Sequence, residues 1–306
     1  MGNLYVHGGG GAGDFIYQYF NSYAWRCLPS VLSNYSDAFV TAIIQTHHPS
    51  LAELVYLHPA ITAVTTYKWY MPGDPKERWW KAGVVGEELG AWAQSINIKD
   101  GSRNGYEHKI YLTVAEENLL KEIKAAGPYV IMHPFAGLPH RGAFKHPYDG
   151  KYKCYPDYKY LETATYLAER GYKVYFVGRT ATDGVETLRS FPEDIVLPKD
   201  CHPNIMSLVN KYSFRFNVEV VRRADGFIGS HSSMLSAAWT NDVPSIFFYP
   251  CYDEHGNKRS VLEHGGHVGT WALHKKHNKY FEMSAEDFLK FDSKIPAETL
   301  LQAMRK

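Results

Sequence analysis

Short runs of apolar residues alternate with segments of helical periodicity along most of the chain. In the first half, the pattern predicts strands at 4–7, 38–45 and 62–69. In the second half, residues 129–135 form a continuous apolar run, as expected for a strand buried on both faces of a parallel sheet. The repeated order of strand, helix and strand indicates a doubly wound α/β architecture.

The second half shows this alternation most clearly. A helix is predicted from Asp157, with Leu161, Thr165 and Ala168 at helical spacing and Gly171 as its C-terminal stop. Further strands are predicted at 173–178, 194–198, 226–230 and 245–250, and further helices at 218–224 and 233–241.

The length of 306 residues favours two domains. We place an N-terminal Rossmann-like domain at 1–126 and a C-terminal one at 127–306. The pattern breaks down between about 70 and 108, where Pro, Gly, Trp and charged residues suggest an insertion. The end of the chain, 285–306, predicts two short helices separated by Pro296, and the last helix is expected either in the C-terminal domain or packed back on the N-terminal one.

Composition narrows the class of protein. The net charge of +1 gives no general attraction to nucleic acid or membranes. The four cysteines are scattered without a CxxC pair, which favours free thiols in a reducing compartment. The sequence shows neither a secretory signal nor 18 consecutive apolar residues, so a cytoplasmic location is expected.

Four consecutive glycines follow the first predicted strand. Gly8, Gly10 and Gly13 fit the GxGxxG pattern of dinucleotide-binding turns, but the second strand ends without the acidic residue that would bind the ribose. A P-loop lacks its Lys-Ser/Thr pair. Two interpretations of Asp14 stay open: it is an N-cap, or it is a carboxylate that acts as a general base at the carboxyl edge of the sheet.

Four segments, in order, resemble the heptosyltransferase family of GT-B glycosyltransferases. They are GAGDFIYQYF at 11–20, HPFAG at 133–137, KCYP at 153–156, and the strand–helix–strand segment at 224–250. The resemblance implies an α/β GT-B fold, with two Rossmann-like domains facing a central cleft. It also implies inverting transfer of a sugar from a nucleotide-diphosphate donor to an acceptor hydroxyl. His231, Ser233 and Ser236 depart from the family pattern, so the donor need not be ADP-heptose.

The resemblance also implies roles for individual residues. Asp14 is expected to be the base, and Lys153 to neutralise the leaving diphosphate together with backbone amides at the start of the helix after Ser230. As alternatives, the serines there form an N-cap cluster and Lys153 is merely solvated. The full set of expected donor-binding residues is His133, Gly137, Arg141, Lys151, Gly178, Arg179, Asp183, Ser230, His231, Ser232, Ser233 and Ser236.

The N-terminal domain is expected to bind the acceptor. Its candidate residues are Gly11, Gly13, Trp69, Trp79 and Trp80, since aromatic faces stack on sugars or bases; alternatively, the tryptophans form a small satellite core. No DxD motif occurs, so no metal cofactor is expected. Two HxxH pairs, at 264–267 and 274–277, leave a metal site as a competing interpretation.

Several functions remain alternatives at this stage. The acceptor is a glycan or, by the same fold, a hydroxylated base in DNA. The glycine pattern also fits an NAD(P)-dependent oxidoreductase. A non-catalytic nucleotide-sugar-binding protein would keep the same cleft without needing Asp14.

Overall fold

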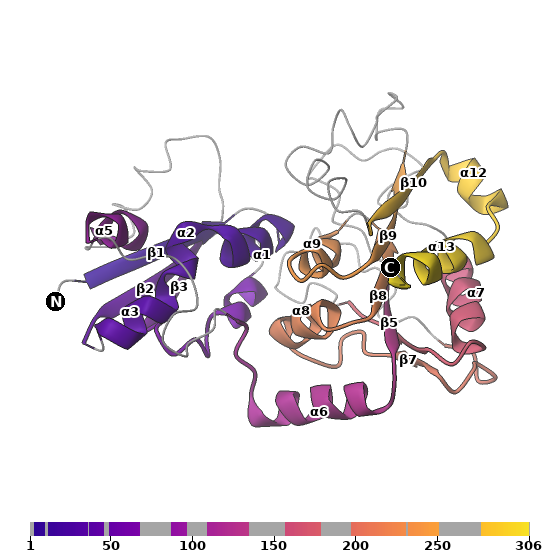
Figure 1. The fold of residues 1–306 in the computed structure, drawn as a ribbon, viewed down its shortest axis with the longest axis horizontal. Coiled ribbons are helices and arrows are strands. Elements are labelled where there is room, and N and C mark those ends of the chain that lie inside the picture. The colour runs from indigo at the N-terminus through magenta and orange to yellow at the C-terminus, as the bar shows by residue number, and fades with distance from the viewer. Residues whose placement is uncertain are drawn as a thin grey trace. The chain divides into compact units, whose positions relative to one another are not determined.

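The chain forms two compact units, Met1–Thr113 and Val114–Lys306 (Figure 1). The computed structural model describes residues 3–9, 12–35, 37–45, 49–67, 87–96, 109–134, 157–178, 197–230, 232–250 and 277–305. Each unit contains a parallel sheet with helices packed beside it, which is the α/β class that the alternating pattern predicts.

In the described part of the N-terminal unit, four strands form a parallel sheet in the order β3-β2-β1-β4. The strands are β1 (Asn3–Gly9), β2 (Phe39–Gln45), β3 (Ala63–Tyr67) and β4 (Glu87–Glu88). The helices are α1 (Ala12–Asn21), α2 (Tyr23–Arg26), α3 (Leu28–Asn34), α5 (Leu89–Ser95) and the 3₁₀ helix η1 (Pro49–Leu54).

An aromatic cluster fastens α1 and α2 to β1. Phe15, Tyr19 and Trp25 are fully buried, and the Phe15 and Trp25 rings meet edge to face with their centroids 5.7 Å apart. The Tyr19 ring lies 5.4 Å from Trp25, and its hydroxyl donates to the Lys109 carbonyl at 2.8 Å. The cluster therefore also holds the end of this unit's chain to its first helix.

In the described part of the C-terminal unit, six strands form a parallel sheet in the order β10-β9-β8-β5-β6-β7. The strands are β5 (Tyr129–His133), β6 (Lys173–Phe176), β7 (Ile205–Ser207), β8 (Gly226–Ser230), β9 (Ser245–Pro250) and β10 (Lys279–Met283). The helices are α6 (Val114–Ala125), α7 (Asp157–Ala168), α8 (Phe214–Arg222), α9 (Ser233–Trp239), α12 (Ala285–Lys290) and α13 (Lys294–Met304).

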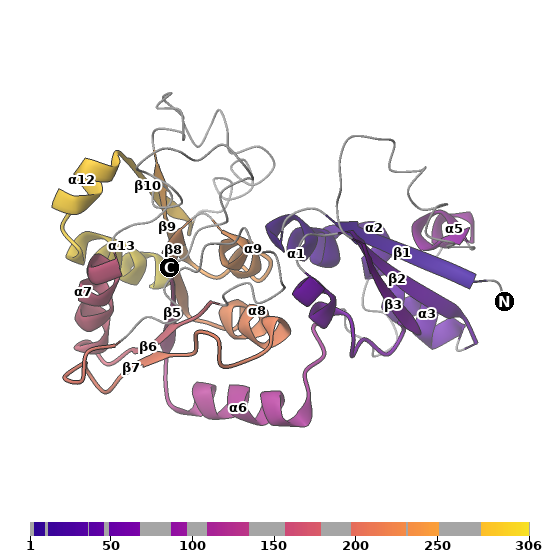
Figure 2. The same ribbon diagram turned by 180° about the vertical axis from the view of Figure 1, so that it is seen from behind.

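Helices cover both faces of the C-terminal sheet. Figures 1 and 2 show α8 and α9 on one face and α7 and α13 on the opposite one. All five residues of β5 and of β8 are buried, which explains why these strands are continuous apolar runs in the sequence. The strand order reverses between β5 and β8, so this pair is the switch point at which Rossmann-like sheets bind ligands.

The units divide before α6, whereas the sequence places the domain boundary after it, at 126–127. Glu116, in the first turn of α6, accepts hydrogen bonds from the Ser213 hydroxyl and from Arg215 Nε, the latter at 2.8 Å. Because Ser213 and Arg215 lie at the start of α8, these bonds fasten α6 to the C-terminal unit.

Some predicted elements differ from those observed. Strand β7, which pairs with β6, was not predicted. The predicted strand at 194–198 lies mostly outside the described residues, which resume at 197. Strand β10 was not predicted either. Residues 87–96, assigned to an insertion, instead form β4 and α5, and β4 pairs with β1. Both β4 and β7 are too short to give a recognisable period in the sequence.

The C-terminal helices are also divided differently. Pro296 lies within the first turn of α13, where a missing backbone N–H leaves no hydrogen bond unmade, and the break falls at 291–293 instead. The last helix, α13, belongs to the C-terminal unit: Leu300 packs against Gly226 of β8, and the Tyr166 hydroxyl of α7 donates to Glu298 at 2.6 Å.

Candidate active site

The glycine turn is shorter than the sequence suggests. Strand β1 runs through Gly8 and Gly9, and α1 begins at Ala12. Asp14 is thus the third residue of α1 rather than its N-cap, which removes the capping interpretation. An acidic residue in a first helical turn is favoured by the helix dipole. The side chain of Asp14 and all of Gly11 lie outside the described residues, while Gly13 is the second residue of α1.

Gly8 serves the packing of α1 on β1. A Cβ atom at this position would lie 2.3 Å from Phe15 Cε2 and 3.3 Å from Trp25 Cζ2. Both rings are fully buried, so they have no free space into which to move. The first glycine of the GxGxxG pattern is therefore explained by contact between strand and helix, without a dinucleotide.

Side chains complete one edge of β1. Trp25 Nε1 donates to the His7 carbonyl at 2.9 Å. The Gln18 amide pairs with Gly9 twice: its oxygen accepts from Gly9 N at 3.0 Å, and its nitrogen donates to Gly9 O at 3.0 Å. His7 and Gly9 are two residues apart, so their backbone groups point to the same edge of the strand.

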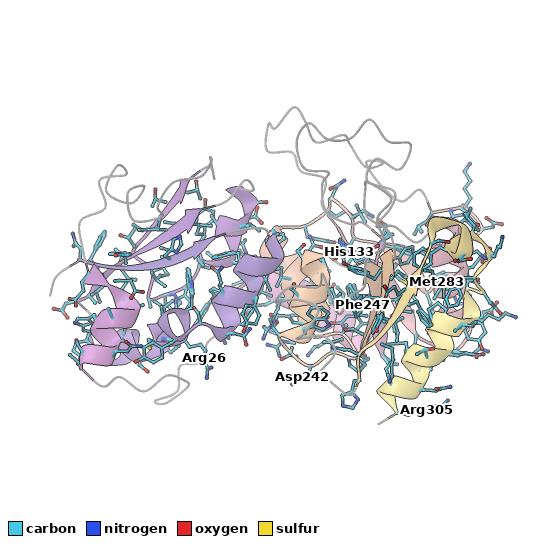
Figure 3. All side chains as sticks on the ribbon, turned by 90° about the horizontal axis from the view of Figure 1, so that it is seen from above. Arg26, His133, Asp242, Phe247, Met283 and Arg305 are labelled. Atoms are coloured by element: carbon cyan, nitrogen blue, oxygen red, sulfur yellow. The ribbon has the colours of Figure 1, made fainter. Side chains whose placement is uncertain are left out.

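His133 ends β5 as a buried, neutral imidazole. It is 6 % exposed, and its Nδ1 lies 2.8 Å from the Val177 carbonyl (Figure 3 shows its place in the unit). A carbonyl only accepts, so Nδ1 carries the proton and Nε2 keeps its lone pair. Burial lowers the pKa of His133 to about 4, and the bond to Val177 opposes this shift only in part. His133 therefore supplies no positive charge for a diphosphate at neutral pH.

Ser230 ends β8 beside His133. The register pairs His133 with Gly229, which places both strand ends at the switch point. The Ser230 hydroxyl donates to the Pro134 carbonyl at 3.3 Å and lies 3.2 Å from the Tyr160 hydroxyl. Ser230 is fully buried, and its bonds join the ends of β5 and β8.

The start of α9 presents an unsatisfied hydroxyl at the same edge. Ser232 is the N-cap residue, with extended backbone angles, but its side chain makes no capping hydrogen bond. Its Oγ is buried and has no hydrogen-bond partner among the described residues. Because buried polar atoms are nearly always paired, this oxygen indicates a place for a ligand group or a water. Ser233 begins α9, and Ser236 is buried one turn later.

The structure therefore gathers part of the predicted donor set at the carboxyl edge of the C-terminal sheet. His133, Ser230, Ser232 and Ser233 lie at the ends of β5 and β8 and at the start of α9, and Gly178 follows β6 at the same edge. Predicted residues outside the described part of the chain are Lys153, Gly137, Arg141, Lys151, Arg179, Asp183, His231, Trp69, Trp79 and Trp80.

Of the four histidines in the two HxxH pairs, only His277 lies among the described residues. In the part of the chain that the structure describes, no three His, Cys, Asp or Glu side chains are grouped so that they could hold a metal ion.

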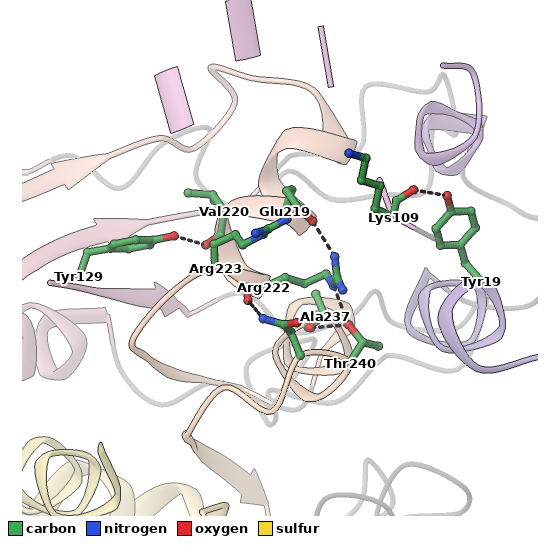
Figure 4. Close-up of polar contacts among 10 residues, drawn as sticks. Tyr19, Lys109, Tyr129, Glu219, Val220, Arg222, Arg223, Ala237 and Thr240 are labelled. Carbon is green, nitrogen blue, oxygen red and sulfur yellow. Dashed lines mark hydrogen bonds and ion pairs between the residues drawn. The ribbon is translucent and has the colours of Figure 1, made fainter. Parts of the chain in front are cut away.

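A buried ionic network between α8 and α9, on the side of the sheet where β8 and β9 begin, was not predicted. Figure 4 shows Glu219 of α8, 3 % exposed at its side chain, accepting from Arg222 and Arg223 at 2.7 Å each. Arg222 Nε also donates to the Thr240 hydroxyl at the C-terminal end of α9, at 3.1 Å. The network thus braces α9 against α8. Its sequence signal was available, because the Glu and the two Arg stand at helical i+3 and i+4 spacing.

Comparison with known proteins decides the family. The sequence profile described as "Glycosyltransferase family 9 (heptosyltransferase)" matches residues 104–279, more than half of the chain. The chain belongs to glycosyltransferase family 9. Among curated proteins, no sequence matches this family 9 chain at a significant level.

Solved structures show the fold of the family 9 chain. Its model is similar to E. coli ADP-heptose LPS heptosyltransferase II, with a TM-score of 0.58 and 12 % identity over 99 % of this chain and 98 % of that one. A glycosyl transferase family 9 structure from Veillonella parvula DSM 2008 gives a TM-score of 0.56 at 11 % identity, covering 99 % and 97 %. E. coli heptosyltransferase WaaC with ADP gives 0.52 at 9 %, covering 99 % and 98 %.

These findings confirm three expectations: the resemblance to heptosyltransferases, the GT-B fold with two Rossmann-like domains, and glycosyltransferase activity with a nucleotide-sugar donor. They set aside the oxidoreductase and the non-catalytic binding protein for this family 9 chain. None of its described helices has the length and apolar character needed to cross a bilayer.

Proposed function

We propose that this enzyme transfers a sugar from a nucleoside-diphosphate donor to an acceptor hydroxyl, with inversion at the anomeric carbon and without a metal. The observation that carries the proposal is the Ser232 hydroxyl at the start of α9, buried and without a hydrogen-bond partner among the described residues, beside the ends of β5 and β8. A switch point with helix amides and an unsatisfied hydroxyl suits the pyrophosphate of such a donor.

The proposed chemistry needs one proton acceptor and one site of charge neutralisation. Asp14 removes the proton from the acceptor hydroxyl while the hydroxyl oxygen attacks the anomeric carbon of the donor sugar. The bond from that carbon to the diphosphate breaks, and the diphosphate leaves with the electron pair. Lys153 and the amides at the start of α9 stabilise the charge that develops on the leaving group. This division needs no paired carboxylates and no divalent cation.

The remaining donor residues are proposed to surround the same group. Arg141, Lys151 and Arg179 add positive charge, Gly137 and Gly178 allow close approach, and Asp183 accepts from the ribose. His133, neutral and with an acceptor at Nε2, suits a hydroxyl rather than a phosphate oxygen. His231 and Ser236 replace family residues here, so ADP-heptose, named for one of the similar structures, is one donor to test among several.

The acceptor is proposed to bind the N-terminal domain. Gly11 and Gly13 lie on either side of the first residue of α1, close in sequence to the proposed base. Trp69, Trp79 and Trp80 supply faces on which a sugar ring of a glycan acceptor stacks. We place the reaction in the cytoplasm, because Cys27 and Cys201, the two cysteines among the described residues, form no disulfide, which fits a reducing compartment.

The test begins with thermal-shift screening against nucleoside diphosphates and their sugars. A ligand at 100 times its Kd is expected to stabilise the protein by about 2.7 kcal/mol. Release of nucleoside diphosphate is then measured with the selected donor, in EDTA, and NMR of the product reports the anomeric configuration. A retained configuration, or activity abolished by EDTA and restored by a divalent cation, contradicts the proposal.

Asp14→Asn tests the base. Transfer is expected to fall by about 100-fold or more, because the amide cannot accept the proton. Asp37→Asn is the matched control, since Asp37 is exposed in the same unit, and it is expected to stay within about twofold of wild type. If Asp14→Asn transfers as fast as the control, Asp14 is not the base.

A further inference from the structure

The N-terminal sheet has an incomplete edge at its own switch point. Strand order reverses between β1 and β4, and β4 pairs with β1 only at Leu4 and Tyr5. The strand stops at Glu88 because α5 begins there, with the Glu88 carboxylate capping it by accepting from Ala91 N at 2.7 Å. In the described part of the chain, the carboxyl half of β1 therefore has no strand on this side.

Gln18 takes the place of a strand at the last residue of β1. A peptide group of a neighbouring strand would offer one donor and one acceptor, and a primary amide offers the same pair. Gln18 uses both on Gly9, at 3.0 Å each. The end of β1 therefore requires a primary amide at position 18, because neither an apolar side chain nor an ionised carboxylate can make both hydrogen bonds.

The two hydrogen bonds between the Gln18 amide and Gly9 close a short loop of chain around the glycine turn. The loop contains Gly10, Gly11 and Gly13, which have the largest conformational freedom of any residue type. Asp14 lies inside this loop, one helical turn before Gln18. Any rotation or sliding of α1 relative to the end of β1 would move Asp14, and the Gln18 amide resists both motions.

Packing alone does not supply this restraint. The Phe15 ring against Gly8 holds α1 close to β1, but apolar contacts have little directional preference. The two hydrogen bonds of Gln18 are directional and fix the register between helix and strand end.

We propose that Gln18 is a positioning residue for Asp14: it holds the first turn of α1 in the orientation in which that carboxylate removes the acceptor proton. This inference rests on the function proposed above. A displacement of about 1 Å at a reacting group can cost about 100-fold in rate, so loss of the restraint is expected mainly in kcat.

The first experiment compares Gln18→Met with Gln94→Met in the full-length enzyme. Met has a similar length and makes neither bond, while Gln94 is exposed on α5 of the same unit. With the donor selected by thermal shift, Gln18→Met is expected to lower kcat by about tenfold or more and to leave the donor KM within about twofold. Gln94→Met is expected to leave both unchanged. The positioning role is overturned if Gln18→Met lowers kcat only in proportion to a loss of folded protein, or if it changes the donor KM and leaves kcat unchanged.

A double mutant separates positioning from a general structural effect. If Gln18 acts through Asp14, Gln18→Met is expected to cause no further loss of turnover in the Asp14→Asn background. Additive losses overturn the inference. If Asp14→Asn is inactive but Gln18→Met keeps wild-type kcat, the inference fails and the proposed function stands. If Asp14→Asn keeps full activity, Asp14 is not the base, and the positioning role of Gln18 is rejected together with that assignment.

Discussion

The first four strands of each unit have the same order, β3-β2-β1-β4 and β7-β6-β5-β8, but the two units complete their switch points differently. In each, the order reverses beside the first strand of the unit, between β1 and β4 and between β5 and β8. Strand β8 runs along β5 from Gly226 to Gly229, and the two ends carry His133 and Ser230. Strand β4 stops after two residues, so the side chains of Gln18 and Trp25 bind the rest of the β1 edge.

The chemistry of the supporting groups differs as well. Among the described residues, the buried charged side chains, Glu219 and Arg222, both belong to the C-terminal unit. Each unit also has a buried histidine: His133 ends β5, and His58 follows η1 in the N-terminal unit. The β1 end is held by neutral groups: a glycine under an aromatic ring, an indole N–H and a primary amide. The comparison teaches that buried charge should stabilise the C-terminal unit and that pH should act on its switch point through His133, whereas packing and neutral hydrogen bonds should decide the N-terminal switch point.

The largest effect is expected at the buried ion pair. Arg222→Met leaves Glu219, 3 % exposed at its side chain, with Arg223 as its one ion-pair partner in the part of the chain that the structure describes. We expect it to lower the free energy of unfolding of the C-terminal unit by about 3 kcal/mol or more, measured by denaturant titration. Arg223→Met is the matched control. Its side chain is 41 % exposed and bonds the same carboxylate at the same distance, so a loss below about 1 kcal/mol is expected. Equal losses for the two variants would contradict a role for burial.

The next effect is a dependence of stability on pH that comes from His133. Its folded pKa of about 4 lies below the ordinary histidine pKa of 6.5, so the unfolded chain binds more protons between these two pH values. Stability contributed by neutral His133 is present above pH 6.5 and is lost as pH falls toward 4, by on the order of 3 kcal/mol in total.

His133→Asn isolates this contribution. The Asn amide can still donate to the Val177 carbonyl but does not titrate. Unfolding free energies of wild type and variant are compared from pH 7 to pH 4.5, and the wild type is expected to lose more. Parallel curves would show that His133 does not titrate with the lowered pKa.

The sequence predicts the fold well where periodicity is long. The buried strands β5, β8 and β9 and helix α7 appear where the apolar pattern places them. Short elements are lost: β4 has two residues and β7 three, below the length at which a period of two can be recognised. The observed boundary between the units lies before α6, not after it as the sequence predicts. The hydrogen bond from Arg215 of α8 to Glu116 of α6 joins residues far apart in sequence, so no local pattern reveals it.

The site is predictable in part for a similar reason. Motif positions such as His133 and Ser230 are visible in the sequence, but their protonation and hydrogen bonds depend on Val177 and Tyr160, which no spacing rule connects to them. Gln18 lies within the GAGDFIYQYF segment, but nothing in that resemblance singles it out, and its role appears only when the end of β1 is seen beside α1.

The smallest predicted effect tests the neutral switch point at Gly8. Gly8→Ala places a Cβ 2.3 Å from Phe15 Cε2, so the buried ring must move. Overpacking is expected to cost about 1–3 kcal/mol of unfolding free energy, reduced by the lower entropy of the unfolded Ala chain. Gly90→Ala is the control in the same unit: a Cβ there lies 3.0 Å from the Glu88 carboxylate and 3.2 Å from Ala24 Cβ, both longer than the 2.3 Å at Gly8, so a smaller loss is expected. Adding Phe15→Leu should recover part of the Gly8→Ala loss, since the smaller side chain relieves the contact. A Gly8→Ala protein as stable as wild type at every pH would mean that α1 does not depend on this glycine, and the contrast between the two switch points would then rest on hydrogen bonds alone.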